Sequence, residues 1–159
     1  DAFGPCQRLL GACAWADAES RAIQIRRGPQ HNDLHGLNVL VDDDRPAMID
    51  FAEVGESPIA TDPLTLELSN YFHPRGVGCS AAGRAQILAG GWWTGAPDPA
   101  VAPFVQECRQ WAQAIAAGDR ERLACAYSYA VRQLKYDDTD KDVATAIACA
   151  AVNALLATF

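Results

Sequence analysis

Lysine is almost missing from this sequence, and basic residues as a whole are outnumbered. Lys135 and Lys141 are the only lysines, and 13 basic residues stand against 20 acidic ones, which gives a formal net charge of −7. Binding to DNA or RNA depends on clustered Lys and Arg side chains that neutralise phosphates. The composition therefore argues against a nucleic acid as a partner.

Long apolar runs and paired cysteine motifs are absent too. The longest apolar run, residues 143–157, is shorter than the roughly 20 residues that a membrane-spanning helix needs, and no signal peptide stands at the start. The six cysteines form no C-x-x-C motif and lie mostly in Ala-rich stretches, which is typical of free thiols in a reducing compartment. We therefore expect a soluble cytoplasmic protein.

The 159 residues, half of them hydrophobic, are enough for one domain with a core. Apolar residues at helical spacing predict a helix over residues 6–27. The short apolar runs 39–41 and 47–49 flank an acidic turn and predict a β-hairpin, followed by a loop over residues 53–61. The expected fold class is therefore α+β and mostly helical.

Helix signals dominate the rest of the chain. Asp62 and Pro63 form an N-cap and first-turn pair. Breaks at residues 90–91, 95–99, 118–119 and 137–140 divide the chain after Ser80 into four predicted helices. Thr139 and Asp142 form a capping-box pattern for the last of them.

Oxygen-bearing side chains flank the predicted hairpin. A register that places Val39 opposite Ile49 puts Asn38 opposite Asp50, and directly opposed residues have Cα atoms about 4.5–5.5 Å apart. An amide and a carboxylate oxygen there suit Mg²⁺, which completes its shell with water and phosphates. Asp33 can curl back toward such an ion and accept a proton from a hydroxyl that attacks phosphorus.

This segment resembles the catalytic loop of the protein-kinase-like phosphotransferases, whose pattern is H-x-D-L-x-x-x-N followed by strand, turn, strand and D-F. The matching residues here are His31, Asp33, Leu34, Asn38, Asp50 and Phe51. His35 and Ala52 are more similar to the branch of aminoglycoside phosphotransferases and choline kinases. Residues 62–72 are also similar to a kinase-like domain of bacterial ternary-complex-associated systems.

The resemblance implies a role for each matching residue. Asp33 would be the catalytic base, and Asn38 and Asp50 would hold Mg²⁺ against the phosphates of ATP. The supporting residues would be His31, which packs near Phe51, His35, and Asp62, whose buried carboxylate holds the catalytic loop by its backbone. The acceptor would be a hydroxyl, favoured here on a small molecule.

A whole enzyme of this family also has an N-terminal lobe, whose strand Lys and helix Glu position the phosphates of the nucleotide. No lysine and no glycine-rich turn precede Asp33. We therefore expect a C-terminal lobe alone over residues 1–159, with the catalytic loop and hairpin at 30–52 and a substrate-side helical region at 62–159. Such a fragment of a longer protein would be poorly active, and its uncovered apolar surface would favour self-association.

Two other functions stay open at this point. His31, Asp33 and His35 alternate, so on a strand they would share one face as the ligand set of a metal-dependent hydrolase. A kinase-like lobe kept as a non-catalytic binding or regulatory module is the other alternative. Nine acidic residues against the single base Arg45 between residues 33 and 67 favour a divalent cation and a cationic acceptor.

Overall fold

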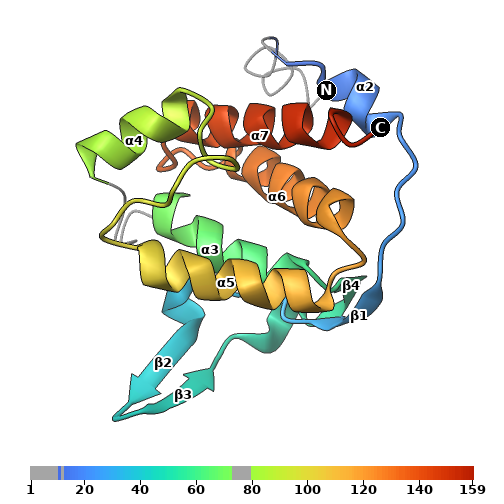
Figure 1. Cartoon of the computed structure of the whole chain (residues 1–159). Helices are drawn as coiled ribbons and strands as arrows, with labels where there is room; N and C mark the ends of the chain where they lie inside the picture. The colour runs from blue at the N-terminus through green and yellow to red at the C-terminus, as the bar shows by residue number, and fades with distance from the viewer. Residues whose placement is uncertain (1–10, 12, 73–79) are drawn as a thin grey trace.

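The computed structural model describes residues 11, 13–72 and 80–159, which form a mixed and mainly helical fold (Figure 1). Two small antiparallel sheets of two strands each accompany the helices. The elements in chain order are α2 (Trp15–Glu19), β1 (Arg27–Gln30), η1 (Gly36–Asn38), β2 (Val39–Asp42), β3 (Arg45–Met48), η2 (Phe51–Glu53), β4 (Gly55–Pro58), α3 (Thr61–Phe72), α4 (Ala81–Leu88), α5 (Ala102–Ile115), α6 (Asp119–Gln133) and α7 (Lys141–Leu156).

The core lies where α3, α6 and α7 meet. Leu64 and Leu68 of α3 are fully buried there, as is Ile147 of α7. Small buried side chains, among them Ala126 of α6 and Ala151 of α7, allow these two helices to pack closely side by side (Figure 1). The alanine-rich composition of the C-terminal half is therefore the composition of a tight helix interface.

The predicted helix over residues 6–27 is wrong over most of its described length. Only Trp15–Glu19 is helical, and residues 21–26 have no regular structure before β1, which pairs with β4. The Arg26 N–H donates to Glu121 Oε2 at 3.1 Å, and the Arg26 carbonyl accepts from Ile59 N–H at 3.0 Å. These tertiary hydrogen bonds outweigh the local apolar pattern. Residues 1–10 and 12 lie outside the described part.

The hairpin of β2 and β3 is confirmed, but its predicted register is wrong by one residue. Val39 pairs with Met48, and the Ile49 N–H donates to the Asn38 carbonyl at 3.0 Å, so Asn38 is opposite Ile49 and not Asp50. The cause is a two-residue turn with Asp43 in the left-handed region at φ 52°, which Asp tolerates. The loop predicted over residues 53–61 also contains a strand, β4, so the hairpin is not the only sheet.

The helices after Ser80 follow the predicted breaks. Ser80 caps α4 through a bond from Gly83 N–H to its hydroxyl, and α5, α6 and α7 lie between the remaining breaks. Two predicted caps are displaced by one residue. Asp140, not Thr139, accepts the N–H groups that begin α7, and α3 begins at Thr61, which places Asp62 within its first turn.

Cys108, Cys125 and Cys149 carry free thiols, as predicted. Burial raises the pKa of Cys108, Cys125 and Cys149 to about 12, so these thiols stay protonated at neutral pH. Cys6 and Cys79 lie outside the described residues. Within that same part, the helices fall short of the length and apolar character needed to cross a membrane.

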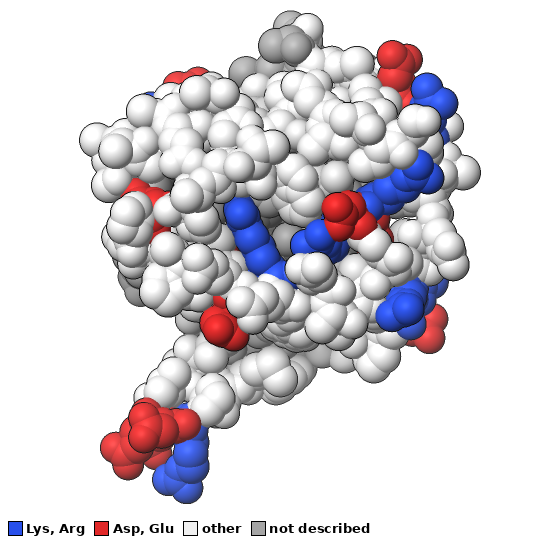
Figure 2. Space-filling view, in the orientation of Figure 1, with Lys and Arg blue, Asp and Glu red and all other residues white. Residues whose placement is uncertain are grey.

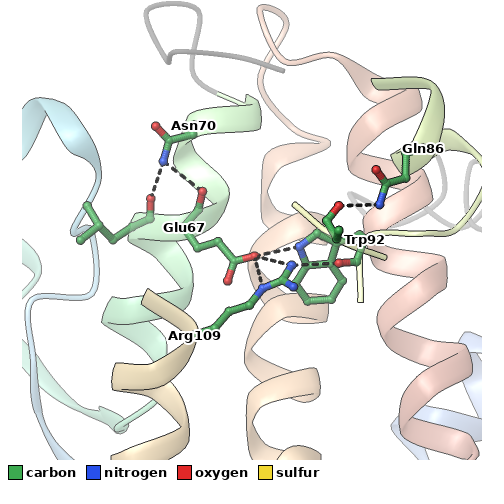
Figure 3. A network of polar contacts seen from close by, with 7 residues as sticks. Glu67, Asn70, Gln86, Trp92 and Arg109 are labelled. Atoms are coloured by element: carbon green, nitrogen blue, oxygen red, sulfur yellow. Dashed lines mark hydrogen bonds and ion pairs between the residues drawn. The ribbon is translucent and has the colours of Figure 1, made fainter. Parts of the chain in front are cut away.

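A buried ion pair joins α3, α5 and the segment after α4 (Figure 3). Glu67 of α3 is completely buried, and its Oε1 accepts from Trp92 Nε1 at 3.1 Å and from Arg109 Nε and Nη2 at 3.0 Å. Arg109 of α5 also donates to the Trp92 carbonyl at 2.8 Å. Burial raises the pKa of Glu67, while Arg109 lowers it. The pair therefore fixes α5 and the segment after α4 onto α3.

We expect Arg109→Met to lower the free energy of unfolding by about 3–5 kcal/mol, because it leaves the Glu67 carboxylate buried without its cation. The measurement is urea denaturation followed by circular dichroism. Glu67→Gln combined with Arg109→Met should recover part of the loss, since no unpaired charge remains. The control is Arg45→Met, which removes only an exposed arginine at the hairpin turn. Equal losses in the single and double variants would contradict this interpretation.

Candidate active site

One buried carboxylate holds the loop between β1 and β2. Asp62 of α3 accepts the His31 N–H at 2.7 Å through one oxygen and the Asn32 N–H at 2.9 Å through the other. The Asp62 N–H donates in turn to Gln30 Oε1 at 3.3 Å. Asn32 lies at φ 66°, a left-handed conformation that asparagine tolerates better than most residues. The start of α3 thus sets the position of the residue just before Asp33.

The loop is closed on itself by Asn38. Its side chain is buried, and Nδ2 donates to the Asp33 carbonyl at 2.9 Å. The Asn38 N–H donates to the His35 carbonyl at 2.8 Å, and His35 Nδ1 accepts from Leu37 N–H at 3.3 Å. Because the amide nitrogen faces Asp33, the side-chain oxygen of Asn38 is left as the group able to bind a cation.

Asp50 follows the hairpin in an unusual backbone conformation. Its φ and ψ are 62° and 63°, and its side chain is exposed. Had β3 continued regularly, the register would send the Asn38 and Asp50 side chains to opposite faces. The left-handed residue interrupts that alternation at the position where a second ligand would be needed. A left-handed backbone is uncommon for a residue other than glycine, and its occurrence at a predicted site supports a functional role.

His31 connects the loop to the end of the hairpin. Its Nε2 lies 2.8 Å from the Ile49 carbonyl, so that nitrogen carries the proton, and its ring centroid lies 5.2 Å from that of Phe51. His31 is buried, and its Nδ1 has no hydrogen-bond partner among the described residues. The contacts are those of a residue that fixes the segment around Asp50.

Asp33 lies between the side chains of His35 and Arg132 and borders a cleft. His35 Nε2 is 3.6 Å from one carboxylate oxygen, and Arg132 Nη2 is 3.7 Å from the other. Arg132 also donates to the Asn32 carbonyl at 3.3 Å. The cleft has a volume of about 220 Å³ and is lined by Asp33, His35, Phe72, Tyr129, Gln133, Tyr136, Asp138 and Thr139.

Sequence reasoning missed two residues near Asp33: Arg132, which contacts its carboxylate, and Tyr129, which lines the cleft. Arg132 and Tyr129 lie on α6, about a hundred residues after the loop, and no local motif connects them to it. Burial, followed by the neighbouring Asp33 carboxylate, raises the pKa of Tyr129, so its hydroxyl stays protonated at neutral pH. Only the packing of α6 against the loop brings these side chains to Asp33.

The geometry does not support a metal site made of His31, Asp33 and His35. These residues lie on a loop and not on a strand, and His31 Nε2 is engaged with the Ile49 carbonyl. In residues 11, 13–72 and 80–159, no three His, Cys, Asp or Glu side chains are grouped so that they could hold a metal ion. The ligand set of the hydrolase alternative is therefore wrong.

Asn38 and Asp50 do fit a magnesium ion in the chemistry of their donors. They offer one amide oxygen and one exposed carboxylate. Asn38 precedes β2 and Asp50 follows β3, and Asn38 is opposite Ile49, the residue before Asp50. Mg²⁺ takes few protein ligands and keeps several waters or phosphate oxygens. Two hard oxygen donors that flank the hairpin, one of them bonded to the Asp33 carbonyl through its amide, match that requirement.

We expect Asp62→Asn to loosen this loop. A carboxamide offers one acceptor oxygen, so one of the two N–H groups from His31 and Asn32 would face an NH₂ group, at a cost of about 1–3 kcal/mol in unfolding free energy. Amide hydrogen exchange at His31 and Asn32 should accelerate more than exchange in α6. Asp43→Asn, at the exposed turn, is the matched control. Unchanged exchange at both amides would show that the carboxylate does not hold the loop.

Comparison with known proteins supports one family. The model of the phosphotransferase enzyme family matches residues 6–103, which include the whole loop, the hairpin and α3. No curated protein and no solved structure matches the chain. The match covers more than half of the sequence and contains every residue of the candidate site except those contributed by α6 and by the segment between α6 and α7. The chain therefore belongs to the phosphotransferase enzyme family.

Proposed function

We propose that this chain carries the catalytic loop of an ATP- and magnesium-dependent phosphotransferase that acts on a hydroxyl group. The observation that carries the proposal is the closed loop: Asn38 Nδ2 is bonded to the Asp33 carbonyl, and Asp62 holds the two residues before Asp33. The proposed base and the proposed metal ligand would thereby be fixed relative to one another before any substrate binds. Such positioning is the main source of catalysis in phosphoryl transfer.

The roles follow from the oxygen atoms that Asp33, Asn38 and Asp50 offer to a proton or to a cation. Asp33 would accept the proton of the acceptor hydroxyl, and Arg132 and His35 would keep its carboxylate oriented toward the cleft. Asn38 and Asp50 would hold Mg²⁺. When bound, that ion neutralises charge on the phosphates of ATP. His31 and Phe51 would keep Asp50 in place through the contacts at the end of β3.

The cleft favours a small cationic acceptor. Two of its lining side chains, Asp33 and Asp138, carry carboxylates, and three others, Phe72, Tyr129 and Tyr136, carry aromatic rings. Carboxylates and aromatic faces both attract organic cations. Residues 62–159, which supply most of this lining, would then be the substrate-side region.

The hairpin surface supports a separate nucleotide-covering lobe, with residues 1–159 as the C-terminal lobe. Large apolar side chains on and beside the hairpin are exposed: Leu37, Leu40, Val41, Met48, Ile49, Phe51 and Val54. The hairpin projects from the helical body and carries charged side chains at its tip (Figures 1 and 2). An exposed apolar surface of this kind marks an interaction site, either for such a lobe or for self-association.

The lysines give a second reason to propose that lobe. Lys141 Nζ donates to the carbonyls of Leu134 and Tyr136, and Lys135 lies over the Tyr136 ring. Both lysines therefore make these contacts just after α6. Neither is near the loop in sequence, and the family needs a lysine for the nucleotide phosphates. Residues 1–159 alone would therefore transfer phosphate poorly. The free thiols support a cytoplasmic location.

Metal binding can be tested on this chain directly. We expect Mn²⁺, used as a paramagnetic stand-in for Mg²⁺, to broaden the amide resonances around Asn38 and Asp50 in two-dimensional NMR spectra. Asp50→Asn should abolish this broadening, because the carboxylate is the one charged ligand. Asp43→Asn, which removes a nearby exposed charge, should leave it unchanged. Broadening centred on Asp42, Asp43 and Asp44 and insensitive to Asp50→Asn would contradict the proposed site.

Turnover can be tested in the longer protein that we propose. Asp33→Asn should lower kcat by about 10²–10⁴-fold, the usual contribution of a general base, while ATP binding is retained. ADP release measures turnover, and Asp42→Asn is the control. Unchanged biological activity in the Asp33→Asn protein would instead favour the non-catalytic binding module.

A further inference from the structure

A second and larger cavity adjoins the cleft at Asp33, with Tyr129 of α6 as the wall that the two share. The volume of this cavity is about 460 Å³, against about 220 Å³ for the cleft. The described residues that line it come from α6, from the start of α3, from the end of β4 and from the segment before β1. We name this cavity the α6 groove. Pockets of a few hundred Å³ are of the size that holds small molecules.

One end of the α6 groove lies against the proposed catalytic base. Asn32, the residue before Asp33, lines this end, and so does Arg132. Arg132 Nη2 is 3.7 Å from an Asp33 carboxylate oxygen, and Arg132 Nη1 donates to the Asn32 carbonyl at 3.3 Å. Asp33 itself lines the cleft. The ion pair of Asp33 and Arg132 therefore stands where the two cavities meet, beside the Tyr129 side chain.

The two cavities differ in the charge that they offer to a ligand. The cleft has the carboxylates of Asp33 and Asp138. Among the described residues that line the groove, Arg132 is the one charged side chain with exposed surface, and it is paired with Asp33. Glu121 also borders the groove, but it is completely buried and has no surface for a ligand to contact. Burial raises the pKa of Cys125 to about 12, so this thiol is neutral.

The groove instead offers apolar surface. Ile23, Ile25 and Pro58 line it together with Ala124 of α6. The Ile25 side chain is 37% exposed, which leaves a large apolar group in contact with water. Covering such surface with an apolar part of a ligand is favourable, because apolar area is removed from water. The groove is therefore suited to an uncharged body, while the cleft is suited to a polar or cationic end.

We infer that the acceptor site extends past Tyr129 into the α6 groove, so that the preferred acceptor carries an apolar body beside the hydroxyl that it presents to Asp33. The inference rests on the proposed function and adds to it the size and polarity of the substrate. Tyr129 is the specificity-determining residue at which the polar and apolar parts of the acceptor meet. Cys125 and Tyr129 are four residues apart on α6, about 6 Å along its axis, a distance that a six-carbon chain covers.

Two probes with the same head group, a protonated amine beside a hydroxyl, test this extension: 2-(hexylamino)ethanol and 2-(methylamino)ethanol. In NMR titrations of the whole chain without ATP or metal, 2-(hexylamino)ethanol should cause saturable amide shifts at Ile23 and Cys125 in the groove and also at Asp33. The Kd of 2-(methylamino)ethanol should be at least about tenfold higher. Burial of about two methylene groups already accounts for a factor of ten in affinity.

A variant that fills the groove provides a second comparison. Ser128→Phe introduces a large side chain at an exposed position of α6 that lines the groove. It should reduce the affinity for 2-(hexylamino)ethanol to that for 2-(methylamino)ethanol. Gln113→Phe introduces the same side chain at an exposed position of α5 and should leave both affinities unchanged. Circular dichroism of the two variants checks that the helices are retained, and the comparison of the two probes needs no variant.

The outcomes separate this inference from the proposed function. Equal affinities for the two probes would overturn the extended acceptor site. Shifts confined to the groove would also overturn it, because one molecule must reach Asp33 as well, and so would hexyl binding that Ser128→Phe leaves intact. Failure of the proposed function is read elsewhere, from unchanged turnover of the Asp33→Asn variant in the longer protein, whereas these titrations involve no phosphoryl transfer.

Discussion

The candidate site depends on the two hydrogen bonds that Asp62 accepts from successive backbone N–H groups of the loop. They connect a segment without regular structure to the first turn of α3, which is itself buried in the helical core. Five residues further along, Glu67 holds α5 and the turn after α4. One helix therefore transmits the rigidity of the core to Asp33 and Asn38. Without that connection, a loop of this kind would sample many conformations.

The parts of this arrangement that depend on local chemistry could be predicted from the sequence. The hairpin followed from two apolar runs around an acidic turn, and the later helices followed from glycine and proline breaks. The spacing of His31, Asp33, Asn38 and Asp50 carried enough information to indicate the family, which the family comparison supports. These features need only residues that are near one another in the chain.

The features that the sequence did not reveal depend on distant contacts. Arg132 reaches Asp33 only because α6 packs beside the loop, and the segment 21–26 is not helical because Arg26 is bonded to Glu121 and Ile59. The register error has another cause, since pairing Val39 with Ile49 did not anticipate a two-residue turn with a left-handed Asp43. A one-residue shift of that kind changes which side chains face each other across the whole hairpin.

The left-handed backbone of Asp50 restricts which residues can evolve at that position. Glycine would adopt the conformation freely but would remove the carboxylate, whereas a β-branched side chain would clash with the main chain. Glutamate would keep the charge but would carry a helix-preferring, longer side chain on an unfavourable backbone. Aspartate and asparagine are the residues that combine tolerance of this geometry with an oxygen donor. Variation within the family should therefore be narrow here even though the side chain is open to solvent.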